Sequence, residues 1–241
     1  MSGNDRYVRT VSLWQKIIAM STTLPEAMYE GETNNGIREG KGILKFSVAK
    51  GKYIGMFQNG FRHGWGEYTT FGGRRTYEGE WKQGRRHGQG HEKWKSREGV
   101  VYAEYEGQYQ DDQFHGQGVY RHFGSKYTGA FVQGRKQGSG EMEYANGDSY
   151  DGEWYNDLRC GRGKYIRKAN GYIFDCEWVD GLKQGPGIEM QPKGYVFEGN
   201  WIDNLKQGSG IMKLPTGKQR GGEWSNDKRI GWTTPEMFPT C

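Results

Sequence analysis

The stretch from Tyr77 to Gly90, YEGEWKQGRRHGQG, is the unit from which most of this chain is built. Approximate copies of it recur at intervals of about 23 residues, and this interval is typical of a repeat array. The copies begin at Tyr29, Tyr53, Tyr77, Tyr105, Tyr127, Tyr150, Phe174 and Phe197, with a truncated ninth copy at Arg220.

Each copy predicts one β-hairpin. Its first, third and fifth positions hold an aromatic residue, a glycine and a second aromatic residue, as in Tyr77, Gly79 and Trp81. Side chains at alternate positions share one face of a strand, so the first strand of the hairpin should have an aromatic face. After a Gly-x-Gly at positions twelve to fourteen, alternating large residues predict the second strand. A polar loop of six residues, such as residues 82–87, should join the two strands.

The glycines of the Gly-x-Gly are expected to make room for aromatic rings. Glycine weakens a strand unless it allows close approach of a large neighbour. We therefore expect a Tyr or Trp of the adjoining strand to lie across the bare glycine. On this interpretation Gly88→Val would overpack the aromatic face.

Composition favours a core of aromatic rings. The chain of 241 residues has 41 glycines and 15% aromatic residues, but only 33% hydrophobic residues. Such a composition does not provide a thick aliphatic core, and periodic aromatics argue against disorder. Three scattered cysteines do not suggest a disulfide framework and favour a reducing, cytoplasmic compartment. No apolar run has the length of a membrane span.

Three regions are predicted: residues 1–28, the repeat array 29–232, and a tail at 233–241. In the first region, apolar residues at helical spacing predict a short amphipathic helix. This docking helix would either anchor a partner or cap the first hairpin. A mitochondrial presequence is a weaker interpretation of this basic, Ser/Thr-containing segment. The apolar residues of the predicted helix are Leu13, Trp14, Ile17 and Ile18.

The repeated YEGEWKQGRRHGQG pattern resembles the MORN repeat, and the resemblance covers residues 29–232. It implies an elongated, twisted, single-layer antiparallel sheet of stacked hairpins, an all-β fold. It also implies a non-catalytic scaffold for protein–protein interactions in a large assembly, in a radial-spoke-like part of the ciliary or flagellar axoneme or in another cytoskeletal structure. Irregular geometry is expected where the chain departs from the pattern, as at Thr33, Cys176 and Arg220.

The aromatic face is the first predicted partner-binding surface, since Trp and Tyr are frequent anchors of interfaces. Its partners would be subunits of a larger assembly, including other repeat proteins or a second copy of this chain. The predicted contact residues are Tyr53, Phe57, Tyr77, Trp81, Tyr105, Tyr109, Tyr127, Phe131, Tyr150, Trp154, Trp178 and Trp201.

The tenth position is the second predicted surface, because it is basic in eight of the nine copies. These residues should form a solvent-facing basic rim that binds an acidic protein segment, a tubulin surface or anionic phospholipids. The lipid alternative would make the chain a membrane-contact module, whereas pairing with acids of the adjacent hairpin would leave the rim without a partner. Nucleic acid is a weaker candidate at a formal net charge of +5. The rim consists of Arg38, Arg62, Arg86, Lys136, Arg159, Lys183, Lys206 and Arg229.

No catalytic residue, cofactor or metal site is predicted. The repeated His63, His87 and His115 occupy equivalent loop positions, which should lie about 10 Å apart and so cannot share one zinc ion. The Gly-x-Gly pairs lack the following helix of a dinucleotide site. The sequence therefore predicts no enzyme activity.

Overall fold

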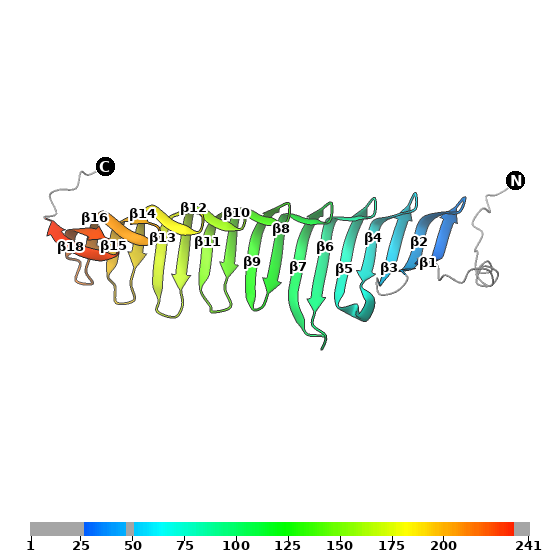
Figure 1. Cartoon of the computed structure of the whole chain (residues 1–241), viewed down its shortest axis with the longest axis horizontal. Coiled ribbons are helices and arrows are strands. Elements are labelled where there is room, and N and C mark those ends of the chain that lie inside the picture. Colours follow the sequence, from blue (N-terminus) through cyan, green and yellow to red (C-terminus); the bar gives the residue numbers. More distant parts are fainter. Residues whose placement is uncertain (1–26, 47–50, 234–241) are drawn as a thin grey trace. The chain divides into compact units, whose positions relative to one another are not determined.

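Figure 1 shows the computed structural model of the protein, which describes residues 27–46 and 51–233. The chain divides between His122 and Phe123 into two compact units, a division that the uniform repeat did not predict. The predicted docking helix with Leu13, Trp14, Ile17 and Ile18 lies outside the described residues, as does the tail after Thr233.

The first unit consists of strands and one short 3-10 turn. They are β1 (Ala27–Asn34), β2 (Ile37–Phe46), β3 (Lys52–Gln58), β4 (Phe61–Thr69), η1 (Phe71–Gly73), β5 (Arg75–Lys82), β6 (Arg85–Lys95), β7 (Val101–Gln110) and β8 (Gln113–His122).

The second unit consists of ten described strands. They are β9 (Ser125–Val132), β10 (Arg135–Glu143), β11 (Ser149–Tyr155), β12 (Leu158–Arg167), β13 (Tyr172–Val179), β14 (Leu182–Met190), β15 (Val196–Ile202), β16 (Leu205–Lys213), β17 (Gln219–Ser225) and β18 (Lys228–Thr233).

Each strand pairs antiparallel with the next strand of its unit. In the first unit this order runs from β1 to β8, and in the second from β9 to β18. Each unit is therefore an open sheet of consecutive hairpins, as Figure 1 shows. The all-β prediction is confirmed, and the described residues include no α-helix.

The hairpin turns are shorter than the sequence pattern suggested. Only Gln83 and Gly84 separate β5 from β6, and both have left-handed backbones with φ of 51° and 83°. Two successive residues with positive φ form the turn that matches the twist of an antiparallel hairpin. The predicted six-residue loop over 82–87 is therefore wrong, because the strands continue up to the turn.

Paired glycines provide the space for the opening tyrosine of a repeat. Gly79 of β5 lies directly opposite Gly90 of β6. A Cβ atom built on Gly90 would stand 2.5 Å from the Tyr77 ring, so the ring fills the space that a side chain would need. The Tyr77 hydroxyl donates a hydrogen bond to the carbonyl of Glu80 at 2.9 Å. The expected packing of an aromatic ring over glycine is confirmed at Gly90.

The twelfth-position glycine has a different role. Gly88 has a φ of +58° and lies where the register of β5 and β6 shifts, which marks a β-bulge. A Cβ atom there would meet the Glu80 carboxylate and not an aromatic ring. The expectation that a ring lies over Gly88 is wrong, because this glycine supplies a left-handed backbone.

Candidate interaction surfaces

The twelve predicted aromatic contact residues form the core of the sheets. Each is at most 4% exposed. In the first unit, rings from successive hairpins meet edge to face, with Tyr53 and Trp81 at 5.3 Å and Tyr77 and Tyr109 at 5.1 Å between centroids. This geometry suits the charge distribution of aromatic rings. Their burial leaves these side chains no surface for a partner, so the surfaces available for contact consist of other residues.

The basic residues of the tenth position lie over the aromatic rings and do not form a separate rim. The Arg62 guanidinium carbon is 4.0 Å from the Trp81 ring centroid, and that of Arg159 is 4.2 Å from the Trp178 centroid. The predicted solvent-facing rim is therefore wrong, because the bulge turns the tenth position onto the aromatic face. Seven of these residues are half-buried and only Arg229 is exposed: Arg38, Arg62, Arg86, Lys136, Arg159, Lys183 and Lys206.

Each of these seven half-buried residues is hydrogen-bonded to the turn of the following hairpin through its side chain or its backbone. Arg62 donates to the carbonyl of Gly84 at 2.6 Å. Arg86 forms an ion pair with Asp112 at 3.0 Å and with the buried Glu92 at 2.6 Å. Burial lowers the pKa of Arg62. Hairpins are thus held together by cation–π contacts and by hydrogen bonds between the next turn and the side chain or backbone of the tenth position.

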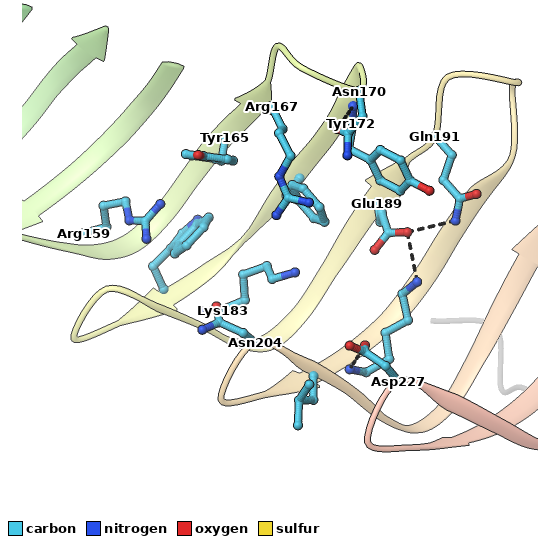
Figure 2. Close-up of a pocket in the computed structure, with 14 residues that line it drawn as sticks. Arg159, Tyr165, Arg167, Asn170, Tyr172, Lys183, Glu189, Gln191, Asn204 and Asp227 are labelled. Carbon is cyan, nitrogen blue, oxygen red and sulfur yellow. Dashed lines mark hydrogen bonds and ion pairs between the residues drawn. The ribbon is translucent and has the colours of Figure 1, made fainter. Parts of the chain in front are cut away.

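A hollow of about 710 Å³ opens on the aromatic face of the second unit. Figure 2 shows Arg159, Lys183 and Asp227 around it, with Glu189 on the side of Gln191. The described lining residues are Arg159, Tyr165, Arg167, Asn170, Tyr172, Phe174, Trp178, Lys183, Glu189, Gln191, Asn204, Leu205, Lys206 and Asp227.

The hollow lies where one repeat departs from the pattern. Cys176 occupies the third position in place of glycine, and its sulfur would stand 2.6 Å from a Cβ atom on the opposite Gly187. The Phe174 ring cannot lie over the glycine as Tyr77 does. It stacks beside Tyr172 at 6.1 Å, with the Lys183 Nζ 4.0 Å from its centroid. The irregularity predicted at Cys176 therefore accompanies a recess in the aromatic face.

The charges in the hollow are unequally paired. Lys206 forms an ion pair with Glu189 at 2.9 Å, and its backbone N–H donates to the Asp227 carboxylate. Among the described residues, no carboxylate lies within 4.0 Å of the charged groups of Arg159 or Lys183. Burial lowers the pKa of Lys183. Arg167, which also lines the hollow, has no ion pair among the described residues either, so the hollow has three cations available to an acidic ligand.

A ridge of apolar side chains lies on the opposite face of the same unit. It consists of cross-strand pairs that flank three successive turns, and each member is between 38% and 58% exposed. Adjacent positions of a strand point to opposite faces, so the ridge faces away from Trp154 and Trp178, and Leu205 at its end also borders the hollow. We call this surface the apolar ridge. Its pairs are Tyr155 with Leu158, Val179 with Leu182, and Ile202 with Leu205.

Groups that could support chemistry are few in the described part of the chain. No three His, Cys, Asp or Glu side chains gather there in a metal-binding arrangement. Burial raises the pKa of the Cys176 thiol to about 11, which disfavours the reactive thiolate. No helix among the described residues is long and apolar enough to cross a bilayer.

Sequence reasoning missed the buried acids and the apolar ridge. Glu92 and Glu189 occupy the sixteenth position, where Leu44 and Met142 stand in other repeats, and they are 1% and 5% exposed. An acidic residue at a repeat position that is otherwise apolar or aromatic was the sequence feature that could have indicated a buried acid. The ridge was hidden because its residues fall in the segment that was assigned to a polar loop.

These features define a class: a repeat protein of stacked β-hairpins with surfaces on both faces of its sheet. The chain belongs to the MORN-repeat family, because the family description "MORN repeat" matches more than half of it. No curated protein matches the chain. The matched segments are residues 29–48, 53–73, 77–97, 105–122, 127–149, 150–171, 177–194 and 197–219.

Proposed function

We propose that the protein is a non-catalytic scaffold that binds protein partners within a large assembly. The observation that carries this proposal is the apolar ridge, because exposed apolar side chains that gather on one face often mark an interaction surface. The buried aromatic rings already provide the core, so the ridge is not required to fill it. With the hollow on the other face, the second unit can contact two partners at once.

The assembly that we propose is ciliary or flagellar, in a radial-spoke-like part of the axoneme, or otherwise cytoskeletal and cytoplasmic. The support for this location is membership of the MORN-repeat family, which includes scaffolds of cilia and of other cytoskeletal structures. The alternative, a module that binds anionic lipids, has weaker support. Seven of the eight basic residues at the tenth position are half-buried over aromatic rings, so they do not project toward a flat membrane surface.

The test compares two variants with the same added charge in ciliated cells. Val179→Lys with Leu182→Lys places two lysines on the apolar ridge, at a directly paired position. Gln110→Lys with Gln113→Lys makes the same change at the equivalent pair in another hairpin and is the control. We expect wild type and control to co-sediment with detergent-extracted axonemes, and the ridge variant to be released.

Two results would contradict the proposal. One is co-sedimentation that the ridge variant retains in full. The other is wild-type protein that is absent from every cytoskeletal fraction but floats with anionic vesicles at physiological salt, which would favour the lipid alternative. A ridge variant that only converts a dimer into a monomer would show that the ridge joins two copies of this chain.

A further inference from the structure

The hollow of the second unit presents three unpaired cations over a recessed aromatic floor, and two of them, Arg159 and Lys183, belong to the tenth-position column. Arg159 is on β12 and Lys183 on β14, at the same position of consecutive repeats. Arg159 donates to the carbonyl of Gly181 at 2.8 Å, which orients its guanidinium while leaving it without a carboxylate partner. Lys206 is the third cation of this column and is already neutralised by Glu189.

The spacing of the two cations selects the geometry of a ligand. Strands β12 and β14 are separated by one strand, so equivalent positions on them lie about 9.6 Å apart. Residues one heptad apart on an α-helix are separated by about 10.5 Å and project from nearly the same face. Same-face residues of an extended strand repeat about every 6.8 Å, which does not match. Long basic side chains can absorb the difference of about 1 Å to a helix.

Charge further along the column gives the ligand a direction. Next to Lys183, the hollow holds Lys206 with both Glu189 and Asp227, which sums to one negative charge. A helix that places two acidic residues on Arg159 and Lys183 would bring its next heptad position beside this negative charge. A basic residue is therefore favoured at that position of the helix. The half-buried rings of Tyr165 and Tyr172 offer aromatic surface beside the charges.

We propose that this hollow binds an acidic α-helical segment of a protein partner, with acidic residues one heptad apart on Arg159 and Lys183 and a basic residue one heptad further on. The inference rests on the proposed scaffold function and names the class of partner that this face takes. A membrane surface fits less well, because a flat bilayer cannot follow cations that lie inside a recess.

The test uses full-length protein and two labelled peptides of three heptads and identical composition. In the first, Glu, Glu and Lys stand one heptad apart on one face of the helix, and in the second the same residues are spread around it. We expect fluorescence anisotropy to show tighter binding of the first peptide. Lys183→Met keeps the aliphatic stem and should weaken it about tenfold, the effect of losing about 1.4 kcal/mol. Lys164→Met, at an exposed position of β12, is the control.

A charge swap distinguishes the loss of one contact from misfolding of the variant. Lys183→Glu should bind a peptide with Lys in place of the matching Glu better than the original peptide, provided that circular dichroism shows an intact sheet. Equal binding of both original peptides, or equal losses in the Lys183 and Lys164 variants, would overturn the inference. Flotation with phosphatidylserine vesicles that depends on Lys183, without preference between the peptides, would also overturn it and indicate a lipid ligand.

This test and the axoneme test fail separately. If co-sedimentation depends on the ridge but neither peptide binds, the scaffold function stands and the helix inference falls. If the peptide binds as expected but the chain never co-sediments, the hollow is confirmed as a helix site and the proposed assembly is wrong.

Discussion

Gly88 and Gly90 are two residues apart and serve different physical needs. Gly90 makes room for the Tyr77 ring, whereas Gly88 supplies a left-handed backbone at a bulge. The spacing of the glycines was enough to predict strands, because a period of two survives the bulge. The spacing could not distinguish the two roles, because both repeat positions are glycine and the residue type alone does not reveal which of them has a positive φ.

Gly90→Ala should destabilise the first unit by about 1–3 kcal/mol, because the added methyl group overpacks the Tyr77 ring. The control is Gly134→Ala, where φ is +79° but no atom lies within 4 Å of the new Cβ. That variant isolates the cost of a left-handed backbone, about 1–2 kcal/mol.

Urea melts of both variants supply the measurement, and a second substitution identifies the cause. In a Tyr77→Leu background the penalty of Gly90→Ala should shrink, since neighbouring changes are not additive. An unchanged penalty in that background would show that the ring is not the obstacle.

At the scale of the element, the hairpin places a basic side chain over the ring of the next repeat. The sequence predicted which residues belong to this column but not where they lie. A loop of six residues was expected there, and the alternation of side chains that assigns a strand residue to one face of the sheet does not apply in a loop. The observed bulge and two-residue turn place the tenth position on the aromatic face, where Arg62 and Arg159 pack against rings. The residues of the candidate site could therefore be predicted from the sequence, but their position could not.

Arg62→Glu should therefore lower stability as well as change charge. Loss of a half-buried cation–π contact costs about 1–2 kcal/mol, and the new carboxylate would face the negative surface of the Trp81 ring. Arg85→Glu makes the same charge change at a side chain that is 62% exposed and should have little effect. Equal thermal stability of the two variants would contradict this account.

The buried tyrosines make the sheets sensitive to alkali. Burial raises the pKa of Tyr53, Tyr77 and Tyr105 well above the usual value of about 10. Above pH 10 the folded state therefore binds more protons than the unfolded state, and the free energy of unfolding falls as pH rises. We expect tyrosinate absorbance to appear together with loss of the strand signal in circular dichroism. Gradual ionisation of all tyrosines near pH 10 in an intact sheet would contradict the prediction.

For the whole molecule, each strand pairs with its neighbours in sequence inside its own unit, so a complete repeat is a removable unit. Deletion of residues 150–173 brings Phe174 to the place of Tyr150 in the order of the chain and preserves the alternation of strand directions. We expect a folded protein by circular dichroism with lower stability in urea. Deletion of residues 149–157 removes β11 and its turn alone.

That second deletion is the control, because it would ask β10 and β12 to pair in parallel across a connection too short for a crossover. We expect it to misfold or aggregate. If both deletions fold equally well, contacts between successive hairpins do not define the repeat as the unit of stability.

The antiparallel order of hairpins also determines how the protein would respond to mechanical load. Tension along the stack of strands opens hydrogen bonds one after another, as in a zipper, so hairpins detach singly from an end. A repeat of about 23 residues that occupies about 9.6 Å of the stack can extend to about 80 Å. Each detachment therefore lengthens the chain by about 70 Å while the remaining hairpins keep their partners. Under load the array would extend in steps and limit the force on the partners that it connects.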